Sequence, residues 1–265
     1  MPTPTDLAGL QARWRFNDLA QADATAITAI SDISGASTAR NLAQATGTKQ
    51  PLYAAGVNGI NGLGCANFDG VDDALIGPGA NLTGLLNAVG AGILWVIGKN
   101  TASGTGTDRH AMFVSSNSSG SGRAFARLAV TTRFNTAGGR RLDADTSATV
   151  TGGSIVDATT PHIWLYVFDW TNALVSIYQD GTLSVGPSAF QTAGNTSATN
   201  PADMSLGNNI GSTAGWQGLI AEAGIHHAVG SAGNRAILDT YAKDVYNITV
   251  SDYINPAGDL IIARS

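Results

Sequence analysis

Three aspartates stand close together in the segment 56–76, GVNGINGLGCANFDGVDDALI. Asp69, Asp72 and Asp73 could act as metal ligands, as a catalytic acid pair, or as acceptors for backbone amides in tight turns. Calcium takes about six to eight oxygen ligands, and Asp32 from an earlier loop could add one. Asp69 opens an Asp-Gly turn, however, and the adjacent Asp72 and Asp73 diverge in an extended chain. The segment therefore predicts turns whose backbone donors Asp72 and Asp73 satisfy, with calcium as the open alternative.

Catalytic acids are scarce in this sequence. Glycosidases place two carboxylates on either side of one glycosidic bond, but Glu222 is the only glutamate, and residues 220–224 contain no second acid. A serine nucleophile needs a Gly-x-Ser-x-Gly turn, and in the segment 211–215 (GSTAG) the serine stands one position too early. The sequence therefore predicts a protein that is not an enzyme, with no catalytic residue and no cofactor.

The histidines and the cysteine do not predict a metal site. His226 and His227 are adjacent, so on a strand their rings point to opposite faces and do not share one ion. His162 precedes an apolar strand and is predicted to be a structural histidine with a hydrogen-bond partner. Cys65 is the single cysteine, so we expect a buried small side chain that belongs neither to a disulfide nor to a zinc site.

Carbohydrate binding would need exposed aromatic rings surrounded by amides, carboxylates or guanidinium groups. Trp216 and the pair Asn208-Asn209 lie in a loop where this is feasible. Trp170, in a turn, and the pair Arg109-His110, beside a Gly/Ser/Thr-rich loop, are further candidates. These residues form no single constellation in the sequence.

Composition excludes two classes of partner. Charged residues make up 12% of the chain and the net charge is −5, so the sequence shows no basic face of the kind that nucleic acids require. The longest basic run, Arg140-Arg141, lies beside two glycines and is predicted to be a solvated loop tip. The N-terminus lacks the pattern of a secretory signal, and no apolar run is long enough to span a membrane. We therefore expect a protein made in a cytoplasm, without nucleic-acid or membrane partners.

Short apolar or alternating segments predict a protein built mainly of strands. The run 92–98 is apolar and bracketed by glycines, which predicts a strand buried on both faces. Alternation in the segment 12–16 places Trp14 and Phe16 on one face, and Asp180-Gly181 predicts a two-residue hairpin turn. The predicted strands cover residues 12–16, 92–98, 111–115, 124–130, 163–168, 174–178 and 219–227.

Spacing also predicts the arrangement of the last strand and a helix. In the predicted strand 219–227, apolar residues recur at every second position. This places four side chains on one face: Leu219, Ala221, Ala223 and Ile225. Apolar residues at three- and four-residue spacing predict a helix over 234–246, about three turns long. Many short strands, glycine-rich turns and one late helix indicate a single all-β sandwich. We expect residues 1–10 to form an N-terminal arm and residues 11–265 to form one domain with a short C-terminal tail.

Several motifs occur in an order that resembles a known fold family. In the first half they are WRF at 14–16, SDISG at 31–35, GING at 59–62 and NFDGVDD at 67–73. In the second half they are PHIW at 161–164, IYQDG at 177–181, LG at 206–207 and WQGLIAE at 216–222. From residue 11 to residue 247 the chain resembles laminin-G-like, concanavalin-A-like jelly-roll domains. The resemblance implies a jelly-roll sandwich with one short C-terminal helix, a structural role for Glu222 and a core position for Trp216.

Domains of this fold serve as lectins, glycanases, adhesion modules and virion proteins. With its Ala/Gly/Thr-rich composition, the chain is most similar to bacteriophage virion proteins of the tail fibre or the head decoration. The resemblance implies a non-enzymatic structural protein of the virion, either a capsid decoration or a head or tail appendage. Its partners would be other virion proteins, such as major capsid or tail proteins, further copies of itself in a homo-oligomer, and host surface polysaccharide. The alternative is a carbohydrate-binding, receptor-recognition module of a tail fibre.

Overall fold

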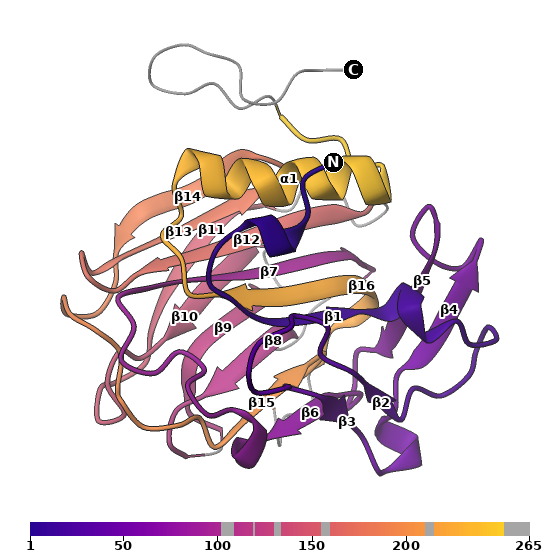
Figure 1. Ribbon diagram of the computed structural model, residues 1–265, viewed down its shortest axis with the longest axis horizontal. Coiled ribbons are helices and arrows are strands. Elements are labelled where there is room, and N and C mark those ends of the chain that lie inside the picture. The colour runs from indigo at the N-terminus through magenta and orange to yellow at the C-terminus, as the bar shows by residue number, and fades with distance from the viewer. Residues whose placement is uncertain (102–108, 119, 130–133, 155–159, 210–214, 252–265) are drawn as a thin grey trace.

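Two eight-stranded antiparallel sheets pack face to face in the computed structural model, which describes residues 1–101, 109–118, 120–129, 134–154, 160–209 and 215–251 (Figure 1). The prediction of an all-β sandwich is therefore confirmed. Side chains between the sheets form the inner core. A second apolar cluster, the outer layer, lies on the opposite face of one sheet. We call the sheet with two covered faces sheet A and the other one sheet B.

The strand orders of the two sheets interleave distant parts of the chain. Sheet A has the order β14 (Thr182–Ala189), β13 (Leu174–Gln179), β12 (His162–Asp169), β7 (Ala91–Asn100), β16 (Gln217–His226), β5 (Gly62–Asp69) and β4 (Leu52–Gly56), with β1 (Leu10–Arg15) paired to β16. Sheet B has the order β11 (Ala148–Ser154), β10 (Phe134–Gly139), β9 (Gly122–Ala129), β8 (Arg109–Ser115), β15 (Asp203–Leu206), β6 (Leu75–Pro78), β3 (Leu42–Ala43) and β2 (Ala29–Ile30).

Strand β7 is buried on both faces, as its apolar sequence predicts. Leu94 and Val96 pack in the inner core, whereas Ile93, Trp95 and Ile97 belong to the outer layer. All five side chains are fully buried. Because burying one large apolar side chain contributes about 1.5–3 kcal/mol, this central strand stabilises both layers at once.

Helix α1 (Ala232–Tyr246) covers the outer face of sheet A (Figure 1). It begins slightly before the predicted start because Ser231 caps it, with Oγ accepting a hydrogen bond from the Asn234 amide at 3.2 Å. It ends at Tyr246, after which Asn247 adopts a left-handed conformation with φ 51°. Among the described residues, we find no helix with the length and apolar character needed to cross a membrane.

Short 3-10 turns precede the first strand and connect several of the later ones. In the described residues they are η1 (Pro4–Asp6), η2 (Phe16–Leu19), η3 (Gly47–Lys49) and η4 (Gly79–Asn81). Leu7, directly after η1, is 2% exposed and belongs to the outer layer. Part of the segment predicted as an N-terminal arm therefore packs beside α1.

A β-bulge in β16 changes which side chains face the inner core. Ile220 lies opposite Gly98 of β7, but Glu222 lies opposite Ile97, so the strand carries one extra residue here. Ala221 and Glu222 consequently both face the outer layer and α1. The prediction of one shared apolar face is wrong, because the four side chains divide between the outer layer (Leu219 and Ala221) and the inner core (Ala223 and Ile225).

The bulge directs Glu222 into a buried polar network with β1 and α1. Arg13 Nε donates to Glu222 Oε1 at 2.5 Å, and Arg13 Nη2 donates to the Tyr241 hydroxyl at 2.8 Å. Glu222 Oε2 accepts hydrogen bonds from the hydroxyls of Tyr241 at 2.8 Å and Tyr246 at 2.6 Å. Arg13 is 7% exposed and Glu222 is 0% exposed, so each charge compensates the other away from water. These contacts confirm the structural role implied for Glu222.

Sequence patterns predict the apolar strands and miss the polar ones. The hairpin turn between β13 and β14 has the predicted positive φ angles, 49° at Asp180 and 78° at Gly181. Strand β14, and strands β10 and β11 of sheet B, lie in stretches without a predicted strand. They consist largely of Thr, Ser, Gly and Ala, so no apolar alternation marks them, and pairing with distant strands defines them instead.

Replacing Glu222 tests the buried network. Glu222→Gln should destabilise the protein by about 3–5 kcal/mol, because it leaves the buried Arg13 guanidinium without a countercharge. Tyr246→Phe, which removes one hydroxyl bond to the same carboxylate, should cost about 1.5–3 kcal/mol. Urea unfolding followed by tryptophan fluorescence measures both free energies. Equal costs for the two variants, or no cost for Glu222→Gln, would contradict this assignment.

Candidate functional site

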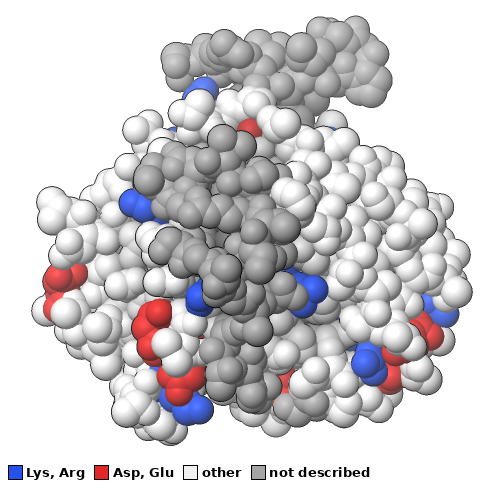
Figure 2. All heavy atoms as spheres, turned by 180° about the vertical axis from the view of Figure 1, so that it is seen from behind, with Lys and Arg blue, Asp and Glu red and all other residues white. Residues whose placement is uncertain are grey.

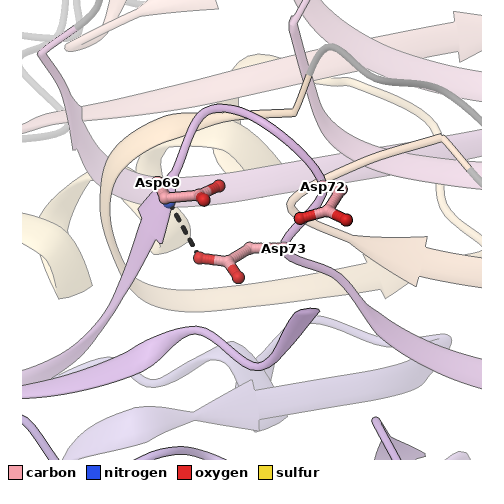
Figure 3. A group of neighbouring side chains, drawn as sticks. All are labelled: Asp69, Asp72 and Asp73. Carbon is pink, nitrogen blue, oxygen red and sulfur yellow. Dashed lines mark hydrogen bonds between the residues drawn. The ribbon is translucent and has the colours of Figure 1, made fainter. Parts of the chain in front are cut away.

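The three aspartates of the segment 56–76 gather at the end of β5 (Figure 3). Asp69 is the last residue of the strand, and Asp72 and Asp73 stand in the loop that leads to β6. One carboxylate oxygen from each residue lies within 4.8 Å of the other two. Phe68, just before them, packs in the inner core. A core strand thus anchors one side of this Asp69 cluster, and the loop returns the other two carboxylates to it.

Two of the carboxylates bind backbone amides of their own loop. Asp69 Oδ1 accepts a hydrogen bond from the Val71 amide at 2.7 Å, and Asp73 Oδ2 accepts one from the Asp69 amide at 2.9 Å. The predicted role in satisfying the turn is therefore confirmed for Asp73. Asp72 instead lies 3.7 Å from Lys49 Nζ, in an ion pair at the surface.

The loop offers a cation few oxygens beyond these carboxylates. Arg109 Nη1 donates to the Gly70 carbonyl at 2.6 Å, so that oxygen is already engaged. The Val71 carbonyl accepts hydrogen bonds from the Gly215 amide at 3.3 Å and from Asn208 Nδ2 at 3.4 Å. Calcium takes about six to eight oxygen ligands. The three carboxylates supply six only if each binds the ion with both of its oxygens. The geometry therefore fits a turn better than a calcium site.

Asp32 does not join the cluster. Its Oδ1 accepts hydrogen bonds from the amides of Arg13 at 3.0 Å and Ser34 at 2.8 Å, and its Oδ2 accepts one from the Arg40 amide at 2.9 Å. The acidic group found within the described residues comprises the three aspartates of the Asp69 cluster alone. Asp32 organises the loop after β2 instead.

Asp73 is the buried member of the cluster, with 5% of its surface exposed. Burial raises the pKa of its carboxyl group to about 6, and the nearby Asp69 and Asp72 add to this rise. Because the folded state then binds the proton more tightly than the unfolded chain, the contribution of Asp73 to stability is full below about pH 4. That contribution is lost as the pH rises through about 6. At neutral pH the loop therefore carries a destabilising negative charge.

Other groups capable of acid–base or nucleophilic chemistry are buried in structural positions. Burial lowers the pKa of His110 to about 3 and that of His226 to about 4. Burial raises the pKa of Cys65 to about 12, so its thiol is a poor nucleophile. His162 Nδ1 lies 2.6 Å from Asp180 Oδ2, which confirms the prediction of a structural histidine. These side chains serve the fold.

The tryptophans considered for sugar stacking are buried as well. Trp216 and Trp170 are both 0% exposed. Trp216 packs edge-on against Trp164, with ring centroids 5.6 Å apart, and Trp170 stacks on Phe168 at 5.1 Å. The core position implied for Trp216 is therefore confirmed, and neither ring is free to lie against a sugar.

The pair Arg140-Arg141 is not the solvated loop tip that the sequence predicts. Arg140 Nη1 donates to the Asp143 carbonyl at 3.0 Å. Arg141 donates to Thr192 Oγ1 at 2.9 Å and to the Asn195 carbonyl at 3.0 Å. Arg140 thus stays within the loop after β10, whereas Arg141 joins that loop to the loop after β14, a contact between distant segments that the local sequence does not reveal.

A polar pocket lies at the β4 end of sheet A. Its volume is about 260 Å³, and we call it the Asp23 pocket. Asp23, Asn58 and Asn67 supply its polar side chains. Leu52, which is 43% exposed, contributes an apolar wall. The pocket therefore combines hydrogen-bonding groups with apolar surface.

The Asp23 carboxylate is held in place from two directions. Oδ1 accepts a hydrogen bond from the Ala55 amide at 2.8 Å, and Oδ2 accepts one from Asn58 Nδ2 at 2.8 Å. A carboxylate has about four acceptor positions, so both oxygens keep capacity for a further donor. Because Asp23 and Asn67 lie far apart in the chain, no spacing pattern in the sequence indicates this pocket.

Comparison with protein-family models gives no match, and comparison with curated proteins gives none either. Among solved structures, Trypanosoma rangeli sialidase is 14% identical, with a TM-score of 0.58 over 90% of this chain and 33% of that chain. The same sialidase in complex with sialic acid is 12% identical, with a TM-score of 0.55 over 90% of this chain and 34% of that chain. The CBM40 of Ruminococcus gnavus IT-sialidase is 14% identical, with a TM-score of 0.46 over 59% of this chain and 85% of that chain.

At these identities the likeness to the sialidase shows the fold alone. The chain is an antiparallel β-sandwich of two sheets, like the part of the sialidase that it matches. It spans about a third of the length of that sialidase chain. The resemblance inferred from the sequence motifs is therefore confirmed for the fold.

Neutralising Asp73 tests the electrostatics of the Asp69 cluster. Asp73→Asn should stabilise the protein by on the order of 1 kcal/mol at about pH 7.5 and have little effect at about pH 4.5, where the wild-type carboxyl group is already protonated. The asparagine keeps an oxygen for the Asp69 amide and removes the buried charge. Thermal unfolding at both pH values measures the effect. Asp72→Asn, at the partly exposed rim, is the matched control and should change little, whereas a destabilised Asp73→Asn at the higher pH would contradict the assignment.

Proposed function

We propose that this jelly roll is a non-catalytic carbohydrate-binding module whose sugar site is the Asp23 pocket. The observation that carries the proposal is the fixed Asp23 carboxylate, which lines the same pocket as the amides of Asn58 and Asn67. Sugar hydroxyls donate to carboxylates and exchange hydrogen bonds with amides, so these groups suit a ring with several hydroxyls. Exposed Leu52 offers apolar surface to the C–H groups of the same ring.

The positions of the acid, base and nucleophile candidates support binding over catalysis. Glu222 is engaged in its ion pair with Arg13, and Cys65 and His226 are buried. Hydrolysis of a glycosidic bond requires two carboxyl groups that face the bond. Asp23 is the one carboxylate that lines the proposed sugar pocket.

Charge favours neutral sugars as the ligand class. The sialidase that shares the fold forms a complex with sialic acid, so sialosides belong among the probe sugars. An acidic sugar would meet the Asp23 carboxylate, and two like charges in one pocket disfavour binding. We therefore infer that neutral, hydroxyl-rich sugars bind more tightly than sialosides.

A glycan array followed by calorimetry tests this function. The protein should bind neutral oligosaccharides on the array and release no sugar from them. Asp23→Asn and Asn67→Ala should each weaken binding about tenfold, the loss expected from one hydrogen bond. Isothermal titration with the best array glycan measures the change.

Asp18→Asn is the matched control for these variants. It removes a surface carboxylate that pairs with Arg15 and does not line the pocket, so its affinity should equal that of the wild type. An array without a bound glycan would overturn the carbohydrate-binding function. Pocket variants that bind as well as the control would overturn the assignment of the site.

We further propose that the module is a structural component of a bacteriophage virion, as a capsid decoration or a head or tail appendage that contacts other virion proteins and further copies of itself. The low charge of the chain supports this: charged residues are 12% of the sequence. On the face seen in Figure 2, the blue and red side chains are few and scattered among uncharged ones. A surface poor in charge loses little hydration when neighbouring subunits cover it.

Mass spectrometry of purified virions tests the virion role. The chain should be present in stoichiometric copies with the capsid or tail proteins, because a structural component is incorporated at fixed sites. Its absence from purified particles would overturn the virion role. That result would not affect the proposed sugar site, which the glycan array and calorimetry test separately.

A further inference from the structure

A second hollow, the hairpin groove, lies at the opposite end of sheet A, on the outer face of β13 and β14. Its volume is about 270 Å³. Strands β12, β13 and β14 form its floor, and residues just before α1 form one side. Because the helix covers the middle of the sheet, this end of the outer face stays accessible.

The groove is apolar along most of its length and acidic at one end. Leu174, Pro187 and Val229 supply apolar surface, and Val229 is 59% exposed. Tyr178 marks one end, two strand positions beyond Ser176. Asp169, which lies opposite Leu174 in the strand pairing, marks the other end. An occupant would therefore meet an aromatic ring, then aliphatic side chains, then a carboxylate.

The chain itself arrives at the Tyr178 end of the groove. The Ser251 amide donates to the Asp180 carbonyl at 2.8 Å. The Ser251 hydroxyl lies 2.8 Å from Thr182 Oγ1. These contacts hold Ser251 against the turn that joins β13 to β14. Residues 252–265, DYINPAGDLIIARS, follow it in the sequence and lie outside the described residues.

We propose that residues 252–265 of this same chain bind in the hairpin groove, with Leu260, Ile261 and Ile262 on the apolar walls and Arg264 beside Asp169. The order of residue types along the segment matches the order along the groove. The segment has three aliphatic residues followed by an arginine, and the groove has apolar walls followed by the Asp169 carboxylate. Burial of the aliphatic side chains supplies the free energy, and the ion pair sets the direction of the segment.

Residues 252–265 are long enough to extend along the hairpin groove from Ser251. An extended chain advances about 3.3 Å per residue, so the nine peptide steps from Ser251 to Leu260 reach up to about 30 Å. The groove from Tyr178 to Leu174 covers four strand steps, or about 13 Å. The segment is therefore long enough to reach the apolar walls. With Leu260 placed at the Tyr178 end, the four steps to Arg264 cover about 13 Å and reach the Asp169 end.

Spin labelling of the full chain tests the proposal. A nitroxide is attached at Ser265→Cys, while Cys65, at 0% exposure, stays protected. The NMR signals of the methyl groups of Val229 and Leu174 should broaden, and those of Leu52 at the opposite end of sheet A should not. Adding Ile261→Asp to the labelled chain should restore the Val229 and Leu174 signals, because a charge on the apolar walls expels the segment.

Two further samples test which residues occupy the groove and whether they come from the same chain or from a second copy. Ile254→Asp, a matched change in the same segment before the proposed contact, should leave the broadening in place. A mixture of spin-labelled chains and isotope-labelled chains should show no broadening. Broadening in the mixture would mean that a second copy supplies the segment and would overturn the proposal. Unbroadened Val229 and Leu174 signals in the labelled chain would overturn it as well.

Discussion

The buried ion pair between Arg13 and Glu222 determines where the layers of this protein lie. Its members come from β1 and from the bulge of β16, and the tyrosines of α1 donate to the same carboxylate. A buried charge that loses its partner costs several kcal/mol, so the helix is bound over the middle of sheet A. At the two ends of this sheet, Leu52 of β4 stays exposed and the hairpin groove stays open.

This placement separates the parts of the molecule that stabilise the fold from the parts that remain accessible. The charged and nucleophilic groups of the middle region, such as Glu222, His226 and Cys65, are enclosed in packed layers. The two uncovered ends carry the Asp23 pocket and the hairpin groove. One end presents polar groups suited to a sugar, and the other presents apolar walls suited to a peptide segment. The proposed binding role rests on these accessible surfaces.

The sequence predicts the fold better than it predicts the sites. Strand β7 is recognisable because each face of it is apolar, and the Asp180-Gly181 turn is recognisable because a tight hairpin turn needs two positive φ angles. The bulge at Ala221 is not recognisable, because a single extra residue leaves the local pattern unchanged while it reverses the face of every later side chain. The Asp23 pocket is hidden for another reason: its polar groups meet only through tertiary contacts.

The most direct test of the account is an NMR titration of the wild-type protein with the neutral glycan that binds best. If the sugar binds in the Asp23 pocket, the side-chain amide signals of Asn58 and Asn67 and the methyl signals of Leu52 should shift together, with one dissociation constant. The signals of Val229 and Leu174 at the other end of sheet A should stay in place. Shifts confined to the hairpin groove, or to the loop of the Asp69 cluster, would contradict it.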